Sequence, residues 1–409
     1  MNVEQFFSKP WYPEGVIKEV LDSTEIGLLK YYKLHTRFGN LEMLHVDNMN
    51  ELDVFQKLIS DLKNTEDFEF WGVLKDLDKV EEIKISESEC GIRITLTTKN
   101  ISLDGLFHIF PIKSWRRKWS KLESNEFLKP VGGIQWKGKD LMVFRESENV
   151  EKISWKTDAS SNFSEIGTIL GRFHCLMLDN SAPRMEKEWN SRLKRLEKIT
   201  SSGTLWRVPY SKNTNSIRSL GNLKLSNWII VNDKIKLDLL SLGFQNFGNL
   251  VDDNNRFSCL RDIASIYHEI DNSNISLTSN SKKFLRKIFF DSWRNSAPER
   301  WYSKSALDGN LGGMQIWRYD VELYNLFLCR LFQKNFDRTW INSVKDIQRS
   351  LFNYRIISAT SLGMLFSSAI IAFLWPNISL INKLIIFILG IFLYFVGMNF
   401  YRNTSLPPY

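Results

Sequence analysis

Cysteine is scarce in this 409-residue sequence, and the four that occur lie far apart. No two of them form a CxxC pair, which argues against a zinc-finger type of metal site and against a disulfide framework. We therefore expect buried thiols in a reducing compartment. The four are Cys90, Cys175, Cys259 and Cys329.

The N-terminal sequence also lacks the apolar core of a secretory signal. Its first residues, MNVEQFFSKPW, contain no apolar run of the length that such signals need. We therefore expect the large domain to lie in the cytoplasm.

The sequence also lacks zinc-finger spacing and the aromatic signatures of RNA-binding domains, which argues against a nucleic-acid-binding protein. Its formal net charge is nevertheless +8. A basic chain can bind nucleic acid, an anionic membrane surface or an anionic ligand such as a nucleotide. The C-terminal sequence favours the membrane surface. We expect membrane lipids as partners, and no nucleic-acid partner.

Two long runs near the C-terminal end, residues 356–375 and 384–401, contain no charged side chain. At 1.5 Å per residue, a run of about 20 residues spans about 30 Å, the thickness of the hydrocarbon core of a bilayer. Pro376 and Asn377 between the runs are turn residues. The pattern predicts a transmembrane hairpin over residues 356–401. A pair of buried core helices is the alternative, but two such runs in tandem are rare in soluble folds.

Basic residues flank the predicted hairpin. Lys345, Arg349 and Arg355 precede it and Arg402 follows it, whereas the intervening loop carries only Lys383. The positive-inside rule then places both ends of the hairpin in the cytoplasm.

The chain before the hairpin predicts an α+β fold with two lobes, because strand patterns come first and helical patterns follow. Residues 83–100, 105–113 and those from Leu141 read as strands, and the pattern turns helical after residue 160. Apolar spacing over residues 52–62 predicts an earlier helix. The predicted segments are a mixed or helical stretch at 1–85, an N-terminal lobe at 86–150, a helical C-terminal lobe at 151–345 and the hairpin at 356–401.

The most informative stretch is GNLKLSNWIIVNDKIKLDLL, residues 221–240. A polar loop with Asn222, Lys224 and Asn227 leads into a predicted β-hairpin whose second strand ends at Asp238. In kinases, a loop and hairpin of this kind bring a hydroxyl nucleophile and a metal–nucleotide together. The segment resembles the catalytic loop of the protein-kinase-like superfamily, which reads H-x-D-x-K-x-x-N or H-G-D-x-x-x-x-N. The chain looks most like the aminoglycoside phosphotransferase and choline kinase branch, and secondarily like lipopolysaccharide core kinases.

Other segments resemble that branch in the same order along the chain. LGRFH at 170–174 is similar to its L-x-x-L-H helix, and RDIAS at 261–265 is similar to its R-D-L-A helix start. IFPIK, ending at Lys113, matches the strand that carries the phosphate-binding lysine, and LMVFRE matches the hinge that contacts adenine. The resemblance covers roughly residues 85–340.

The resemblance implies roles for individual residues, with ATP and Mg²⁺ as cofactors. Asn222 and Lys224 stand in the catalytic positions. Lys113, its helix partner Glu126 (or Glu123) and the hinge residue Glu146 would bind the nucleotide. Asn227 and Asp238 would bind the metal.

Plainer interpretations remain for several of these residues. Lys113 can be a surface lysine, and Asn227 and Asp238 can be turn and strand-end residues. His174 is more typical of a hydrogen-bonded helix residue than of a catalyst. Asp262 can cap a helix, whereas the resemblance implies an acid that braces the loop.

The departures from the family pattern bear on activity. The catalytic Asp is replaced by Asn222 and the His by Leu220, and an amide cannot accept the substrate proton. GxGxxG is missing, and Cys90-Gly91 is the one candidate for the turn that covers the phosphates. The sequence therefore favours a membrane-anchored degenerate kinase that acts as a scaffold or regulator with a protein partner. The alternatives are a weakly active ATP-dependent phosphotransferase for a hydroxyl of a sugar-like or lipid-linked substrate, and an assembly factor without a nucleotide site.

Overall fold

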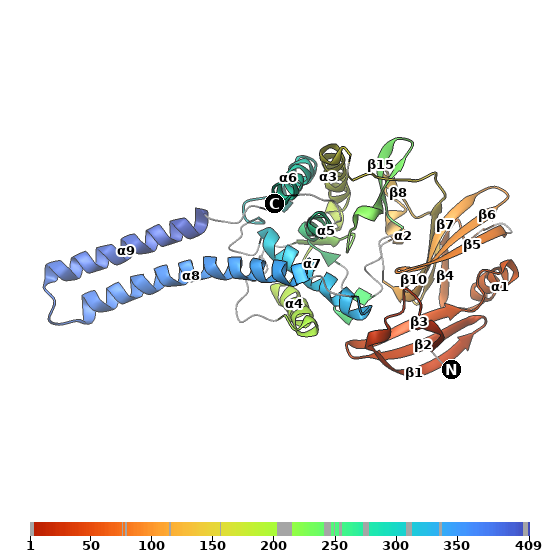
Figure 1. Cartoon of the computed structure of the whole chain (residues 1–409), viewed down its shortest axis with the longest axis horizontal. Helices are drawn as coiled ribbons and strands as arrows, with labels where there is room; N and C mark the ends of the chain where they lie inside the picture. The colour runs from red at the N-terminus through yellow and green to blue at the C-terminus, as the bar shows by residue number, and fades with distance from the viewer. Residues whose placement is uncertain are drawn as a thin grey trace.

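The first part of the chain forms a three-stranded antiparallel sheet in the order β1-β2-β3 (Figure 1). The strands are β1 Ile17–Ile26, β2 Leu29–Thr36 and β3 Gly39–Val46. Helix α1, Leu52–Lys63, follows and buries Phe55, Leu58 and Leu62, which confirms the helix predicted over residues 52–62. The computed structural model describes the chain apart from residues 1–3, 76, 78–79, 114–115, 156, 203–214, 241–246, 249, 253–255, 273–277, 308–312, 335–337 and 404–407.

A six-stranded antiparallel sheet forms the core of the N-terminal lobe, in the order β4-β9-β10-β7-β6-β5. β3 packs against β7, so the first sheet covers part of the second. A four-residue helix, α2 Arg116–Trp119, follows β7. The strands are β4 Phe68–Gly72, β5 Val80–Ser88, β6 Gly91–Thr98, β7 Ser102–Ile112, β9 Gly132–Trp136 and β10 Lys139–Glu146.

This sheet begins earlier than the sequence indicated. The boundary predicted at residue 86 falls inside β5, and residues 1–85 hold β1 to β4 as well as α1. Mostly exposed strands, such as β1, give a weaker sequence pattern than the apolar stripe of a helix does. The strands predicted at residues 83–100, 105–113 and from Leu141 are confirmed as β5 to β7 and β10.

The C-terminal lobe is mainly helical, as predicted. A four-stranded sheet, in the order β11-β14-β15-β8, lies where the two lobes meet, and a small sheet has the order β12-β13-β16. The helices are α3 Ala159–Leu176, α4 Glu186–Thr200, α5 Cys259–Asn272, α6 Ser279–Ser296 and α7 Gly313–Leu331. The strands are β8 Phe127–Leu128, β11 Glu151–Lys152, β12 Ala182–Pro183, β13 Asn215–Arg218, β14 Trp228–Val231, β15 Lys234–Asp238 and β16 Arg256–Phe257.

Two glycines of α3 allow its close approach to α6. A Cβ at Gly167 would lie 2.5 Å from the carbonyl oxygen of Phe289, and one at Gly171 would lie 2.8 Å from that of Trp293. Side chains at these positions would force the helices apart. This packing fixes α3, and with it His174, against the rest of the lobe.

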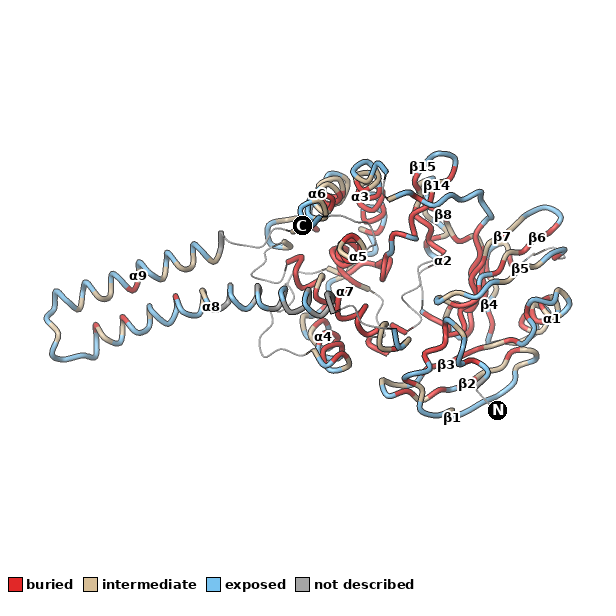
Figure 2. Tube along the Cα trace, viewed as in Figure 1, coloured by how far each residue is buried: buried red, intermediate tan, exposed pale blue. Residues whose placement is uncertain are grey.

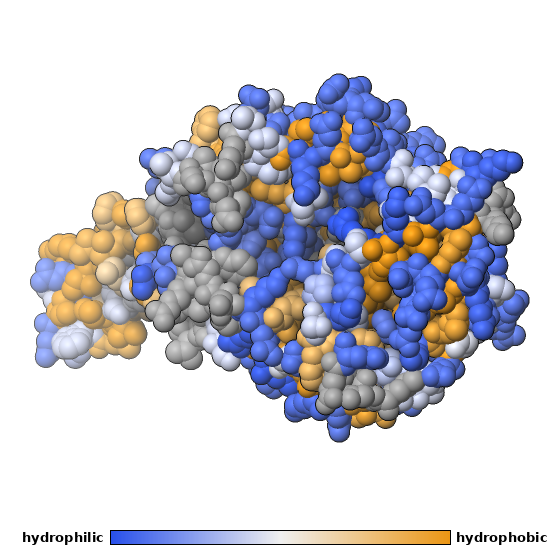
Figure 3. All heavy atoms as spheres, turned by 45° about the vertical axis from the view of Figure 1, so that its right-hand side comes forward, coloured by the Kyte–Doolittle hydropathy of each residue, from blue (hydrophilic) through white to orange (hydrophobic). Residues whose placement is uncertain are grey.

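The C-terminal helices α8, Arg338–Leu374, and α9, Leu380–Asn403, pack against each other as a hairpin that projects from the molecule (Figures 1 and 2). Both are long and apolar enough to cross a membrane. Their apolar side chains face outward (Figure 3): Phe373 is 72% exposed, Leu374 74% and Leu380 83%. The second helix begins four residues before the predicted run at Leu384, so Lys383 lies in its first turn.

Candidate functional site

The polar loop at residues 219–227 leads into the predicted hairpin, which is formed by β14 and β15. Its turn residues, Asn232 and Asp233, have φ angles of 51° and 59°, as a type I′ turn requires. The register pairs Trp228 with Leu237, so Asn227 and Asp238 lie opposite each other at the open end of the hairpin. The structure thus brings together the two residues predicted as metal ligands.

Asp262 on α5 braces the start of the loop. Its carboxylate accepts hydrogen bonds from the Ser219 hydroxyl at 2.5 Å and from the Leu220 backbone N–H at 3.2 Å. His174 on α3 lies 3.3 Å from the same carboxylate through Nε2. Because Trp293 Nε1–H donates to His174 Nδ1 at 2.9 Å, the His174 proton must lie on Nε2, facing Asp262. The bracing role predicted for Asp262 and the structural role predicted for His174 are both confirmed.

A buried ion network holds the middle of the loop. Arg261 donates to the Gly221 carbonyl at 2.6 Å and to Asp320 of α7 at 2.8 Å. Arg192 of α4 binds the same carboxylate at 3.0 Å. Burial alone would raise the pKa of Asp320, but the two guanidinium groups outweigh it and lower that pKa from 3.8 to about 2.

Asn222, at the position of the catalytic acid, is buried and tied to α7. Its amide donates to the Asn325 side-chain oxygen at 3.1 Å, and Asn325 in turn donates to the Val321 carbonyl at 3.0 Å. Lys224 is exposed, and its backbone N–H donates to the Asn227 side chain at 2.7 Å. The loop is therefore held from several sides while its central residue carries no carboxylate.

One face of the six-stranded sheet looks toward Asp238. The register pairs Asp104 of β7 with Arg145 of β10, and Leu106 with Val143 two residues away, so these four side chains share a face. Trp71 of β4 and Leu240, which follows β15, pack with Leu106 and Val143 in one apolar cluster. This face of the sheet therefore faces the C-terminal lobe, opposite Asp238.

Arg145 crosses that space. Its side chain, only 7% exposed, lies 3.2 Å from the Asp104 carboxylate and 3.5 Å from the Asp238 carboxylate. Asp238 also accepts a hydrogen bond from the Leu240 backbone N–H at 2.9 Å. The predicted metal ligand thus has a permanent cation as its neighbour, since the arginine guanidinium does not deprotonate in proteins.

A second buried arginine, Arg116 of α2, joins the lobes. It lies 3.6 Å from the Asp140 carboxylate and donates to the Leu240 carbonyl at 3.2 Å. Gln135 donates to Asp140 at 2.8 Å. Burial raises the pKa of Asp140, and the Arg116 charge opposes that rise.

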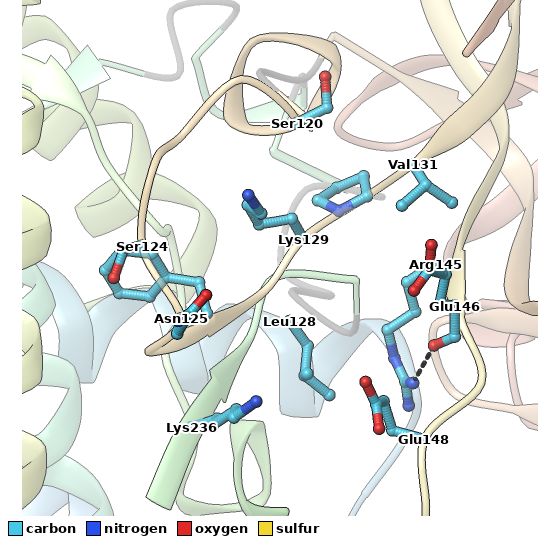
Figure 4. A pocket seen from close by; sticks show the side chains of 12 residues that line it. Ser120, Ser124, Asn125, Leu128, Lys129, Val131, Arg145, Glu146, Glu148 and Lys236 are labelled. Atoms are coloured by element: carbon cyan, nitrogen blue, oxygen red, sulfur yellow. Dashed lines mark hydrogen bonds between the residues drawn. The ribbon is translucent and has the colours of Figure 1, made fainter. Parts of the chain in front are cut away.

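Three predicted nucleotide ligands lie outside this cluster. Lys113 is exposed, one residue past the end of β7. The prediction that Glu126 lies on a helix is wrong, because α2 ends at Trp119. The Glu126 carboxylate pairs with Arg172 of α3. Glu146 ends β10 and is exposed. It lines a cavity of about 520 Å³ with Lys129, Lys236 and Glu148, and Arg145 forms part of the same wall (Figure 4).

The turn between β5 and β6 lies over the polar loop. Glu89 and Cys90 of this turn, together with Asn222, Lys224 and Asn227, line a cavity of only about 120 Å³. A Cβ at Gly91 would lie 2.3 Å from the Phe107 carbonyl oxygen, and its φ angle is 130°, so strand packing and backbone conformation both require this glycine. The turn predicted to cover phosphates closes directly on the loop instead.

Comparisons with known proteins find similar structures and no similar sequences. No protein-family model matches the chain, and no curated protein sequence matches it. Solved structures do match: a glucosamine kinase in crystal form B has a TM-score of 0.51 and 11% identity, covering 83% of this chain and 95% of that chain. Glucosamine kinase in complex with glucosamine, ADP and inorganic phosphate has a TM-score of 0.50 and 11% identity, covering 86% and 99%.

The chain has a kinase-like fold. The predicted fold class is thereby confirmed, whereas at 11% identity the likeness shows the fold alone. Assignment to the aminoglycoside phosphotransferase and choline kinase branch stays a prediction.

A magnesium nucleotide does not fit the described residues of this kinase-like site as they are arranged. Kinases place a lysine on the third strand and pair it with a glutamate on the following helix. Here the positions of β7 that face Asp238 hold Asp104 and Leu106, and the following helix, α2, holds Arg116. The space under the β5–β6 turn is below the roughly 300 Å³ typical of a small-molecule site, and the cavity of about 520 Å³ beside Arg145 and Glu146 is not lined by that turn. Arg145 takes the cation position beside Asp238.

The sequence contains a signal for the residues that sequence reasoning missed. Asp104 and Arg145 are charged residues next to apolar residues in their strands; Arg145 is buried and Asp104 half-buried, and buried charged residues are rarely without a partner. Their pairing depends on strand register, which a single sequence does not reveal. Asn325 gives no comparable signal, because it is one of several polar residues on the long helix α7.

Proposed function

We propose that this protein is a membrane-anchored, kinase-like protein without catalytic activity, which acts as a scaffold or regulator at the cytoplasmic face of a membrane. The observation that carries the proposal is the position of Arg145, within ion-pair distance of both Asp104 and Asp238. A buried charge pair of this kind is costly to break, because either partner alone would be left uncompensated. Arg145 thereby offsets part of the negative charge of Asp238 without a metal.

The fixed loop supports the same proposal. Ser219, Leu220, Gly221, Asn222 and Leu225 are each hydrogen-bonded to a side chain of another helix. The fold thus maintains the loop's shape although Asn222 lacks the carboxylate that would accept a proton. Retained architecture without the reacting group suits a binding surface better than a catalyst.

The anchor is the second half of the proposal. An outward-facing apolar surface as extensive as that of α8 and α9 needs a partner, and both helices have the length that a bilayer requires. Arg349 before the first span and Arg402 after the second favour a cytoplasmic location for both ends and for the kinase-like domain.

Deletion of residues 350–409 tests the anchor. The full chain should stay in the membrane pellet after carbonate extraction, and the shortened chain should move to the soluble fraction because it loses both spans. A shortened chain that still resists carbonate would show that the anchor lies elsewhere.

A weakly active phosphotransferase is the second candidate. The braced loop and the fold shared with glucosamine kinases favour it. In this case Asp238 would become available only when Arg145 moves away, and the acceptor would be a hydroxyl of a sugar-like or lipid-linked molecule.

Substitution of Asn222 by Asp separates the two candidates. We expect the wild type and Asn222→Asp to show the same baseline ATP turnover with Mg²⁺ and glucosamine, since restoring one carboxylate leaves Arg145 beside Asp238. Asn232→Asp is a matched control, because it makes the same change at the exposed turn of the hairpin. A gain in Asn222→Asp alone, approaching the roughly 10²-fold that a general base gives, would establish the enzyme instead.

A further inference from the structure

Helix α6 carries a basic face on the outside of the C-terminal lobe. Lys283, Lys287 and Arg294 are exposed, and their spacings of four and seven residues place them on one side of the helix. The opposite side, with Leu285, Phe289 and Trp293, is buried and packs toward α3. Asp291 is the acidic residue nearest to the basic face on this helix, and it is half-buried.

An apolar side chain stands beside these cations. Phe284 is 57% exposed, although a phenylalanine usually gains by burial. The guanidinium of Arg294 lies 5.3 Å from the Tyr302 ring centre, and Lys283 and Lys287 are exposed beside it. Lysines around an exposed aromatic ring are typical of helices that lie at a membrane surface.

The chain itself ties this helix to the membrane-facing side. Tyr409 packs against Phe290 of α6, and the Lys287 ammonium lies 6.0 Å from the Tyr409 ring centre. The second apolar span ends at Tyr401. Eight residues reach at most about 28 Å, so α6 must lie within that distance of the end of the span. Figure 1 shows α6 and the C-terminal end together on the side from which the hairpin projects.

We infer that the exposed face of α6, formed by Lys283, Phe284, Lys287 and Arg294, contacts anionic lipid headgroups of the membrane that holds the hairpin. The inference rests on the proposed anchor. The lysines would pair with lipid phosphates and Phe284 would enter the headgroup layer, which fixes the orientation of the kinase-like domain.

Lysine labelling tests this contact. The full-length protein is placed in nanodiscs of phosphatidylcholine, alone or mixed with phosphatidylglycerol, and amine acetylation of each lysine is followed by mass spectrometry. We expect Lys283 and Lys287 to react about fivefold more slowly on the anionic discs, because each lysine is attracted to the charged surface. High salt should remove the difference by screening.

Controls come from the same chain. Lys57 on α1 and Lys84 on β5 are exposed on the side of the molecule remote from the hairpin, and both should react equally on the two lipids (Figure 1). Lys287→Glu should restore the reactivity of Lys283 on anionic discs, and Lys57→Glu should not. Equal reactivity of Lys283 and Lys287 on both lipids, in protein that stays in the discs, would overturn the α6 contact and leave the anchor standing. Protein that does not enter the discs would overturn both.

Discussion

At the scale of single residues, two carboxylates of the kinase-like cleft share one guanidinium. Asp104 comes from the N-terminal lobe and Asp238 from the C-terminal lobe, and Arg145 contacts both. Arg145 therefore joins the lobes through charge, where a nucleotide and its metal join them in an active kinase.

Removing this guanidinium should expose the need for a cation. In Arg145→Met, two carboxylates lose their partner, and the free energy of unfolding should fall by about 3 kcal/mol. We expect Mg²⁺ to raise the melting temperature of this variant and to leave that of the wild type unchanged. Arg172→Met is the control, because Arg172 is 58% exposed and pairs with Glu126 at the surface. Identical melting curves for Arg145→Met and Arg172→Met, with and without Mg²⁺, would remove the role given to Arg145.

The buried Asp320 makes a pH-dependent contribution to stability. Its pKa falls from 3.8 to about 2 on folding, so the folded state favours the charged form. The contribution is complete above about pH 4 and is lost as the pH falls toward 2, because protonation breaks the pairs with Arg192 and Arg261. We expect denaturant unfolding to show a stability loss between pH 4 and 2 in the wild type that is absent in Asp320→Asn. The variant should be less stable at pH 7 by about 3 kcal/mol, since it leaves two arginines buried without a carboxylate. Equal stability of the two proteins at pH 7 would contradict this.

At the scale of elements, local patterns in the sequence were reliable where they were strong. The uncharged runs identified the C-terminal hairpin, and the loop from Asn222 to Asp238 identified the kinase-like fold. Lys113 was assigned from strand context alone, and the structure leaves it exposed past β7. The ion pairs of Arg145 could not be predicted, because its partners lie 41 residues upstream and 93 residues downstream in the sequence. Such contacts depend on sheet register and on how the lobes meet.

Two glycine–serine contacts hold the helices of the hairpin close together, and the hydrophobicity pattern does not predict them. Gly397 faces Ser361, and Gly390 faces Ser368, with a Cβ at either glycine falling within 2 Å of the facing serine hydroxyl. Small residues at such crossings let apolar helices approach closely in lipid. The two glycines are seven residues apart, as are the two serines, so the contact repeats along one seam.

A bulky residue at this seam should separate the helices. Cysteines placed at Ser358 and Met398, whose side chains are 3.6 Å apart, should cross-link readily under mild oxidation. Gly397→Leu should lower the yield of that cross-link several-fold, as measured by peptide mass spectrometry. Gly363→Leu is the control, because a Cβ at Gly363 has no neighbour within 4 Å among the described residues. An unchanged yield in Gly397→Leu would show that the seam does not hold the hairpin.

At the scale of the whole molecule, three parts combine into one arrangement. The apolar hairpin is the proposed membrane anchor, α6 lies on the side from which the hairpin projects, and Arg145 and the cluster around Leu106 lie between the lobes. In the proposed arrangement, the hairpin and α6 together fix the orientation of the kinase-like domain at the membrane.

Nucleotide binding tests the central claim most directly. Titration calorimetry with the full-length protein in nanodiscs would measure ATP binding with and without Mg²⁺, with an active kinase run in parallel. We predict no heat of binding for this protein under either condition, since Arg145 occupies the position of a cation beside Asp238 and the space under the β5–β6 turn is only about 120 Å³. Saturable binding of ATP that strengthens with Mg²⁺ would contradict the proposal of a protein without catalytic activity and favour the phosphotransferase.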